Sequence, residues 1–167
     1  MRKIVLLLVV VTTLWGFSVD DISYYSDYSP VLMERSNLEK SIRSVDPVTM
    51  ENPGKIYIKD SLLFIVEKFK GVHVINDYNP SSPVNLTFIT IPGVVDIAVK
   101  GNVLFADNAV DLVSVNISDL NNVKEVKRVK NIFPELYHPE LRYIPSEFSK
   151  ENRPANTVIV NWIKRES

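Results

Sequence analysis

Between residues 54 and 131, apolar and polar residues alternate with a period of two, which is typical of half-buried β-strands. Short clusters of Gly, Pro, Asn, Asp and Ser interrupt the alternation, and these residue types favour turns. The apolar runs predict strands at residues 56–58, 62–66, 72–75, 84–91, 95–100, 103–105, 113–115 and 124–129. Because the linking segments have about two to six residues, they permit antiparallel hairpins but not crossover helices.

The same order of strands and turns occurs twice. Phe64 and Phe105 are 41 residues apart, and Val72 and Val113 have the same separation. A period near 40–45 residues with four short strands is typical of a β-propeller blade. We therefore predict an all-β fold with two four-stranded antiparallel propeller-blade-like repeats, at residues 54–93 and 94–131, which would form an incomplete β-propeller.

The segments on either side of the repeats are less regular. Residues 19–53 form a lead-in segment in which Ser36 and Glu39 have the spacing of a capping box, so we predict a short helix at residues 37–43. Residues 132–167 form a Pro-rich tail, for which we predict an irregular loop. A β-prone run at residues 157–163 predicts a final strand, which either completes a sheet or begins a further unit.

Residues 1–18 have the layout of a secretory signal peptide. Arg2 and Lys3 precede an apolar run at residues 4–15, and Gly16 and Ser18 are small residues at the −3 and −1 positions of a cleavage site. The apolar run is shorter than the ~20 residues of a spanning helix, and an uncleaved anchor is the alternative. We expect an exported protein, either periplasmic or secreted. The chain has no cysteine, so we expect no lipid anchor, disulfide or thiolate site.

Several segments resemble the LVIVD repeat of exported bacterial proteins. These are residues 54–60, 71–76 and 79–84 in the first repeat, and residues 96–102 and 111–118 in the second. Residues 28–33 and 38–41 resemble the leader of the same proteins, so the likeness is to the N-terminal part of the family. The resemblance implies a β-propeller-like protein of the cell envelope with no established biochemical activity. Family members usually have more repeats and often a lipidation cysteine, and this chain differs in both respects.

The composition and motifs argue against several functional classes. The chain has 19 Lys and Arg residues against 20 Asp and Glu residues, whereas nucleic-acid binders usually have a clustered basic face. It has no Gly-x-Ser-x-Gly elbow for a nucleophile and no glycine-rich phosphate loop. We therefore predict no catalytic residue, no cofactor and no nucleic-acid partner.

A few polar residues are candidates for chemistry. Asp107, Asn108 and Asp111 flank one turn and are weak candidates for a divalent-cation site, since calcium prefers several oxygen ligands. Asp and Asn in turns more often bond their own backbone, which is the interpretation we favour. His73 is predicted to be a solvated or hydrogen-bonded strand residue on the face opposite Val72.

One basic run is also present. It consists of Lys124, Lys127, Arg128 and Lys130, and it predicts the exposed face of an edge strand, with Lys124 and Arg128 on the same face.

These observations favour a non-catalytic binding or assembly module of the bacterial cell envelope. Loops at the blade edges would carry recognition. The candidate positions are Asn79, Pro80, Ser81, Asn108, Asp111, Asp119 and Asn121. The expected partner is a protein or envelope component, or a second copy bound through an open blade flank, with membrane contact only through an uncleaved N-terminal segment. The alternatives are a fragment of a propeller-type hydrolase with a divalent cation, and a non-functional truncated family member.

Overall fold

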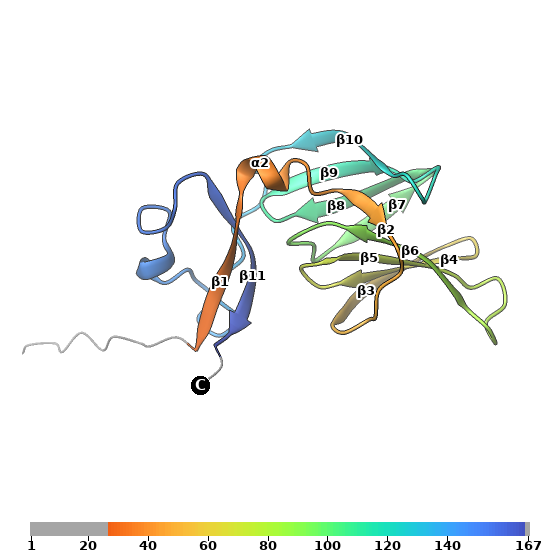
Figure 1. The fold of residues 1–167 in the computed structure, drawn as a ribbon, viewed down its shortest axis with the longest axis horizontal. Helices are drawn as coiled ribbons and strands as arrows, with labels where there is room; N and C mark the ends of the chain where they lie inside the picture. The colour runs from red at the N-terminus through yellow and green to blue at the C-terminus, as the bar shows by residue number, and fades with distance from the viewer. Residues whose placement is uncertain (1–26, 166–167) are drawn as a thin grey trace, which may run out of the picture.

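The computed structural model describes residues 27–165, so the predicted signal segment lies outside the described residues. Among the described residues, no helix has the length and apolar character needed to cross a membrane. The fold is all-β with antiparallel sheets, as predicted. Its three sheets have five, four and two strands (Figure 1).

The five-stranded sheet, here the first sheet, has the order β2-β6-β5-β4-β3. Its strands are β2 (Arg43–Val45), β3 (Pro53–Lys59), β4 (Leu62–Glu67), β5 (Gly71–Asn76) and β6 (Val84–Thr90). The four-stranded sheet, here the second sheet, has the order β10-β9-β8-β7. Its strands are β7 (Ile97–Lys100), β8 (Val103–Asn108), β9 (Asp111–Asn116) and β10 (Lys124–Val129). The strands predicted from the period-two alternation are thus confirmed, with shifts at their ends.

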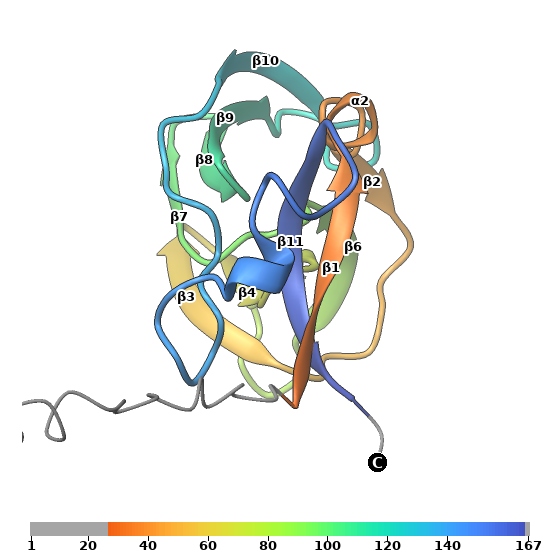
Figure 2. The ribbon, with the colours of Figure 1, turned by 90° about the vertical axis from the view of Figure 1, so that its left-hand side faces the viewer.

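The two sheets stack face to face around one apolar core (Figure 2). We call the faces that meet the inner faces. The first sheet contributes Phe64, Val66, Val72, Val74 and Ile89, and the second sheet contributes Ile97, Val99, Leu104, Ala106, Val113 and Val115. The opposite faces are the outer faces of the stack.

The pairing registers show that the two sheets are repeats, and that the spacing between equivalent residues changes once along the chain. Ile56 pairs with Ile65 as Ile97 pairs with Ala106, which is a spacing of 41 residues. The β4–β5 turn has three residues and the β8–β9 turn has two, so the spacing becomes 40 from β5 onward. The alignment of Val72 with Val113 is therefore wrong: Leu112 is the equivalent of Val72, and Val113 is the equivalent of His73. A bulge at the equivalent place in β6 and β10 supports the same offset.

The lead-in segment contains two strands that the sequence did not predict. β1 (Tyr28–Glu34) precedes a single helical turn, α2 (Arg35–Leu38). β2 pairs with β6 and is an edge strand of the first sheet. The predicted short helix is present, but it lies at residues 35–38 rather than 37–43, and the predicted capping box is wrong. The helix begins two residues earlier without a side-chain cap, and Arg35 Nε donates to the Glu39 carboxylate at 2.9 Å. Arg43 is extended because it pairs with Thr90 of β6.

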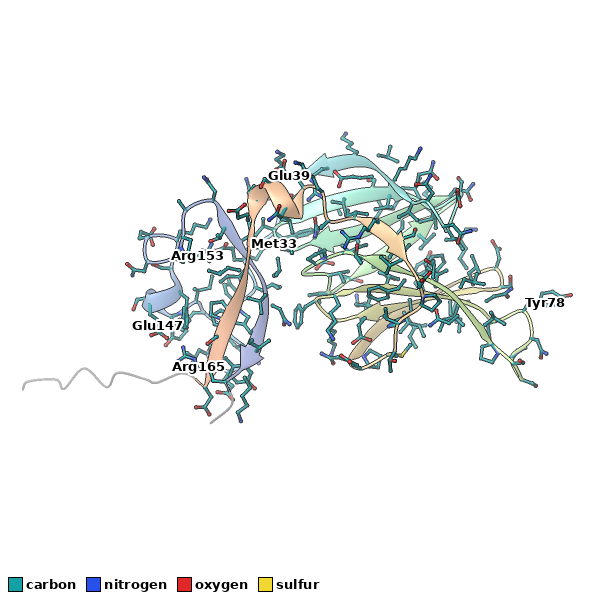
Figure 3. All side chains as sticks on the ribbon, in the orientation of Figure 1. Met33, Glu39, Tyr78, Glu147, Arg153 and Arg165 are labelled. Atoms are coloured by element: carbon teal, nitrogen blue, oxygen red, sulfur yellow. The ribbon has the colours of Figure 1, made fainter. Side chains whose placement is uncertain are left out.

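The predicted C-terminal strand is confirmed as β11 (Thr157–Lys164), and it pairs with β1 to form a two-stranded ribbon. Between β10 and β11, the tail is irregular except for a 3₁₀ turn at Ser146–Phe148. The ribbon packs against the β8–β9 turn through Val158 and Val160, with Met33 pointing toward the sheets (Figure 3). The ends of the described chain thus lie side by side, although the strands are about 130 residues apart in sequence.

Gly71 gives a testable consequence of the strand packing. A Cβ at this position would lie 2.2 Å from the Ile89 carbonyl oxygen, a backbone atom that cannot rotate away. Gly71→Ala is therefore expected to lower the free energy of unfolding by about 2 kcal/mol or more. At Gly54, the nearest atom is the flexible Lys68 side chain at 3.2 Å, so Gly54→Ala is the matched control with a small effect. Urea denaturation compares the two, and equal losses would contradict this packing argument.

Candidate functional site

Asp111 lies at the centre of a buried ion network rather than in an exposed turn. Its carboxylate accepts hydrogen bonds from Arg35 Nη2 and Arg128 Nη1, each at 2.7 Å, and from the Asn131 amide at 2.9 Å. Burial alone would raise the pKa of Asp111, but the bonds from Arg128, Asn131 and Arg35 outweigh burial, so its pKa is lowered. The network ties α2 to the second sheet. Its guanidinium groups occupy the side of Asp111 at which a cation would have to bind.

Asp107 points away from this network. It pairs with Leu112, whereas Asn108 pairs with Asp111, and adjacent pairs face opposite sides of a sheet. The Asp107 carboxylate accepts the amide hydrogens of Val95 and Asp96, at 3.0 and 2.8 Å. The cation candidates Asp107 and Asp111 are therefore not brought together. Within residues 27–165, no group of three or more His, Cys, Asp or Glu side chains is arranged to hold a metal ion.

The seven residues predicted for recognition divide between two ends of the stack. Asn79, Pro80 and Ser81 in the β5–β6 loop, and Asp119 and Asn121 in the β9–β10 loop, are exposed at the end marked by Tyr78 (Figure 3). The loops have matching geometry: the Asn79 and Asp119 side chains each accept an amide hydrogen two residues on. Asn108 and Asp111 lie at the opposite end and are fully buried, so their side chains offer no exposed recognition surface.

Arg128 corrects the prediction of a uniformly exposed basic face. Lys124 and Lys127 are exposed on the edge strand β10, but the Arg128 side chain is only 6% exposed. The bulge between Glu125 and Lys127 shifts the alternation by one residue, so Arg128 pairs with Val113 and turns toward the inner face. Sequence alternation without the bulge placed it on the wrong face.

His73 is hydrogen-bonded as predicted, but it is fully buried rather than solvated. Its Nε2 lies 3.1 Å from the Glu67 carboxylate, which also accepts the amide hydrogens of Glu51 and Asn52. Burial would raise the pKa of Glu67, but the bonds from Glu51, His73 and Asn52 together lower it. The pair fastens residues 51–52 over one end of the first sheet's outer face, which is a structural role.

An apolar groove crosses the outer face of the second sheet. Its floor includes Ala98, Phe105 and Leu112, and the tail at residues 133–137 forms a wall. The groove has a volume of about 480 Å³. The tail is held there because the Phe133 amide donates to the Val110 carbonyl at 3.0 Å, and Trp162 Nε1 donates to the Leu136 carbonyl at 2.9 Å. The volume is within the range of about 300–1,000 Å³ found for ligand sites.

Each acidic side chain at the groove is engaged by other groups of the chain. At Asp107, burial raises the carboxyl pKa more than the bonds from the Asp96 and Val95 amides lower it. The other acidic groups at the groove have cationic partners: Asp96 pairs with Lys55, and Glu135 pairs with Arg153. The groove walls contain no histidine, serine, cysteine or lysine. The groove was not predictable from the sequence, because one of its walls comes from a tail segment without regular structure.

The first sheet also has an apolar outer face. Ile56 and Ile58 of β3 are 61% and 67% exposed, and they share this face with Leu63, Ile65 and Ile75. Exposed apolar patches on sheets commonly mark interaction surfaces. Comparison of the chain with family models, curated proteins and solved structures found no match, so the LVIVD resemblance stays a prediction.

Proposed function

We propose that this chain is an exported, non-catalytic β-repeat protein that binds or assembles with a partner through the outer faces of its two sheets. The signal-peptide layout predicted at residues 1–18 and the LVIVD-like repeats support a setting at the bacterial cell envelope. The observation that carries the binding role is that both outer faces present apolar side chains. Ile56 and Ile58 lie on the first, and Phe105 and Leu112 lie on the floor of the groove on the second.

The arrangement of the acidic residues makes a hydrolase with a bound cation the weaker candidate. Asp107 is bonded to two backbone amides on the outer face, while Asp111 is bonded to two guanidinium groups on the inner side. Neither carboxylate is free to share a cation with the other. Hydrolytic turnover by the purified protein that is lost in Asp107→Ala would contradict the non-catalytic assignment.

Site-specific photo-crosslinking in the exporting cell tests the binding role. A photoreactive phenylalanine analogue at Ile58 or Phe105 is expected to give a crosslinked adduct, because both positions lie on the proposed contact faces. The same analogue at Tyr78, which is 85% exposed on the β5–β6 loop, is the control and is expected to give none. Adducts at Tyr78 alone would assign recognition to the loops, and no adduct at Ile58 or Phe105 would contradict the proposal.

A further inference from the structure

The outer face of the first sheet has the same residue types as the inner face of the second sheet, which is buried. Ile56 and Ile58 are 61% and 67% exposed, whereas their repeat equivalents Ile97 and Val99 are 8% and 6% exposed. The equivalents are buried because the inner face of the second sheet packs on the first sheet. Around Ile56 and Ile58, the first sheet has no such neighbour among residues 27–165.

The equivalence extends over the whole face. Three further outer residues of the first sheet match buried apolar residues of the second, namely Leu63 with Leu104, Ile65 with Ala106, and Ile75 with Val115. Of these three, Ile65 is already buried within the chain, whereas Leu63 and Ile75 are half-buried. The exception is His73, which replaces Val113 and is used to bind Glu67. The outer face of the first sheet thus has residue types like those of the inner face of the second sheet. It is therefore suited to pack against a surface like the inner face of the first sheet.

The chain itself presents a surface of that kind. The first sheet covers the second with its inner face, and the repeat equivalent of that inner face is the outer face of the second sheet. There Phe105 takes the place of Phe64, Val103 that of Leu62, and Leu112 that of Val72. The protein therefore has both halves of one contact, one half on each outer face. Such a contact between copies is head-to-tail.

One ion pair, at the β3 edge of the first sheet and the β7 edge of the second, fits the same arrangement. Lys55 on β3 forms an ion pair with Asp96, which precedes β7 and lies 41 residues later, at the equivalent position. In a head-to-tail contact, Asp96 of one copy meets Lys55 of the next. At this position, opposite charges therefore alternate from unit to unit.

The segments that cover part of each outer face leave the same end of both faces open. Lys55 lies beside Asp96, and the Tyr57 hydroxyl donates to the Val99 carbonyl at 2.8 Å, so the sheets stack with equivalent ends aligned. Residues 51–52 cover the first sheet near its β4–β5 turn. The tail at residues 133–137 covers the second sheet near its β8–β9 turn. Because these turns are equivalent, both faces stay open at the opposite end.

We propose that the partner of this chain is a second copy of itself, with the first sheet's outer face of one copy packed on the second sheet's outer face of the next. This inference rests on the proposed binding role and names its partner. Since propellers contain about 4–8 blades and each copy supplies two, a closed ring would contain two to four copies.

Sedimentation velocity over a series of protein concentrations tests the association. The native protein is expected to form a species of two to four copies. Ile58→Lys blocks one face and Ala98→Lys blocks the other, and both positions are exposed, so the folded chain tolerates them. Each variant alone is expected to self-associate at least about tenfold more weakly. Ile163→Lys, on the exposed end of β11, is the control and is expected to associate like the native protein.

An equimolar mixture of the two blocked variants tests the head-to-tail direction. Each variant keeps the face that the other lacks, so the mixture is expected to form a heterodimer at concentrations where each variant alone stays largely monomeric. Circular dichroism identical to that of the native protein confirms that both variants are folded. Self-association of Ala98→Lys alone would show a contact between two identical faces and would overturn the inference.

Two further outcomes separate this inference from the proposed function. A native protein that stays monomeric at every concentration, while crosslinking at Ile58 yields an adduct with a different protein, would overturn self-association and leave the binding role intact. A monomer without any crosslinked adduct at Ile58 or Phe105 would overturn both.

Discussion

Asp111→Ala is expected to lower the free energy of unfolding by about 3–5 kcal/mol, because it removes the shared partner of two guanidinium groups. Asp111 is fully buried, and Arg128 is only 6% exposed. Without the carboxylate, Arg128 keeps Glu125 as its only acidic partner among those the structure shows, and α2 loses its ion pair to the second sheet. Urea denaturation at neutral pH measures the loss.

Asp119→Ala is the matched control, because Asp119 is also a turn aspartate of the second repeat but is exposed. It accepts one amide hydrogen, from Asn121 at 3.0 Å, and has no ion pair with any of residues 27–165. The expected change is within about 0.5 kcal/mol. If Asp111→Ala cost no more than this control, the ion network would contribute nothing to stability.

The contribution of Asp111 is also expected to depend on pH. Its pKa is lower in the folded protein than in the unfolded chain, so its stabilising effect is present above the ordinary Asp value of about 3.9. The effect is lost as the pH falls below that value and through the lowered folded pKa. The difference in unfolding free energy between the native protein and Asp111→Ala is therefore expected to shrink in acid. A difference that stays constant down to that range would contradict the ion-pair explanation.

The strands of the two repeats were predictable because the necessary information is local. An alternating run such as residues 62–66 shows a half-buried strand without knowledge of its neighbours. The turn at Gly101 was likewise predictable, because glycine readily adopts a positive φ. Its φ is 57° in the structure, and its repeat equivalent Asp60 has a φ of 53°. The all-β class and the approximate period of the repeat follow from such local signals.

The remaining features depend on contacts between distant residues. The one-residue difference between the β4–β5 and β8–β9 turns changes which residues are equivalent, and it is visible only in the pairing. The bulge in β10 turns Arg128 inward, where it binds Asp111. β1 becomes a strand by pairing with β11, which no pattern within residues 28–34 indicates.

The candidate site shows the same division. The sequence identified Asp107 and Asp111 as notable carboxylates, but their positions on opposite faces follow from the register of a two-residue turn. Exposure is a property of the assembled sheets, so the difference between Ile58 and its equivalent Val99 has no counterpart in residue type. Both are β-branched residues with the same alternation.

Phe64→Ala and Phe105→Ala are expected to differ strongly, although the two residues are repeat equivalents. Phe64 is fully buried between the sheets, so its truncation is expected to lower the free energy of unfolding by about 3–5 kcal/mol. Phe105 lies half-buried on the floor of the groove, and the expected loss is about 1–2 kcal/mol in a dilute, monomeric sample. Urea unfolding measured on both variants gives the two values.

Protein concentration adds a second comparison to this pair. If a second copy covers Phe105, the loss caused by Phe105→Ala rises toward that of Phe64→Ala at concentrations where the native protein associates, because the ordered contact then buries both rings. The loss caused by Phe64→Ala changes less, since the second sheet of the same chain buries Phe64 at every concentration. A Phe105→Ala effect that is independent of concentration would show that nothing covers this face in solution. Equal losses in the dilute sample would show that the monomer already buries Phe105.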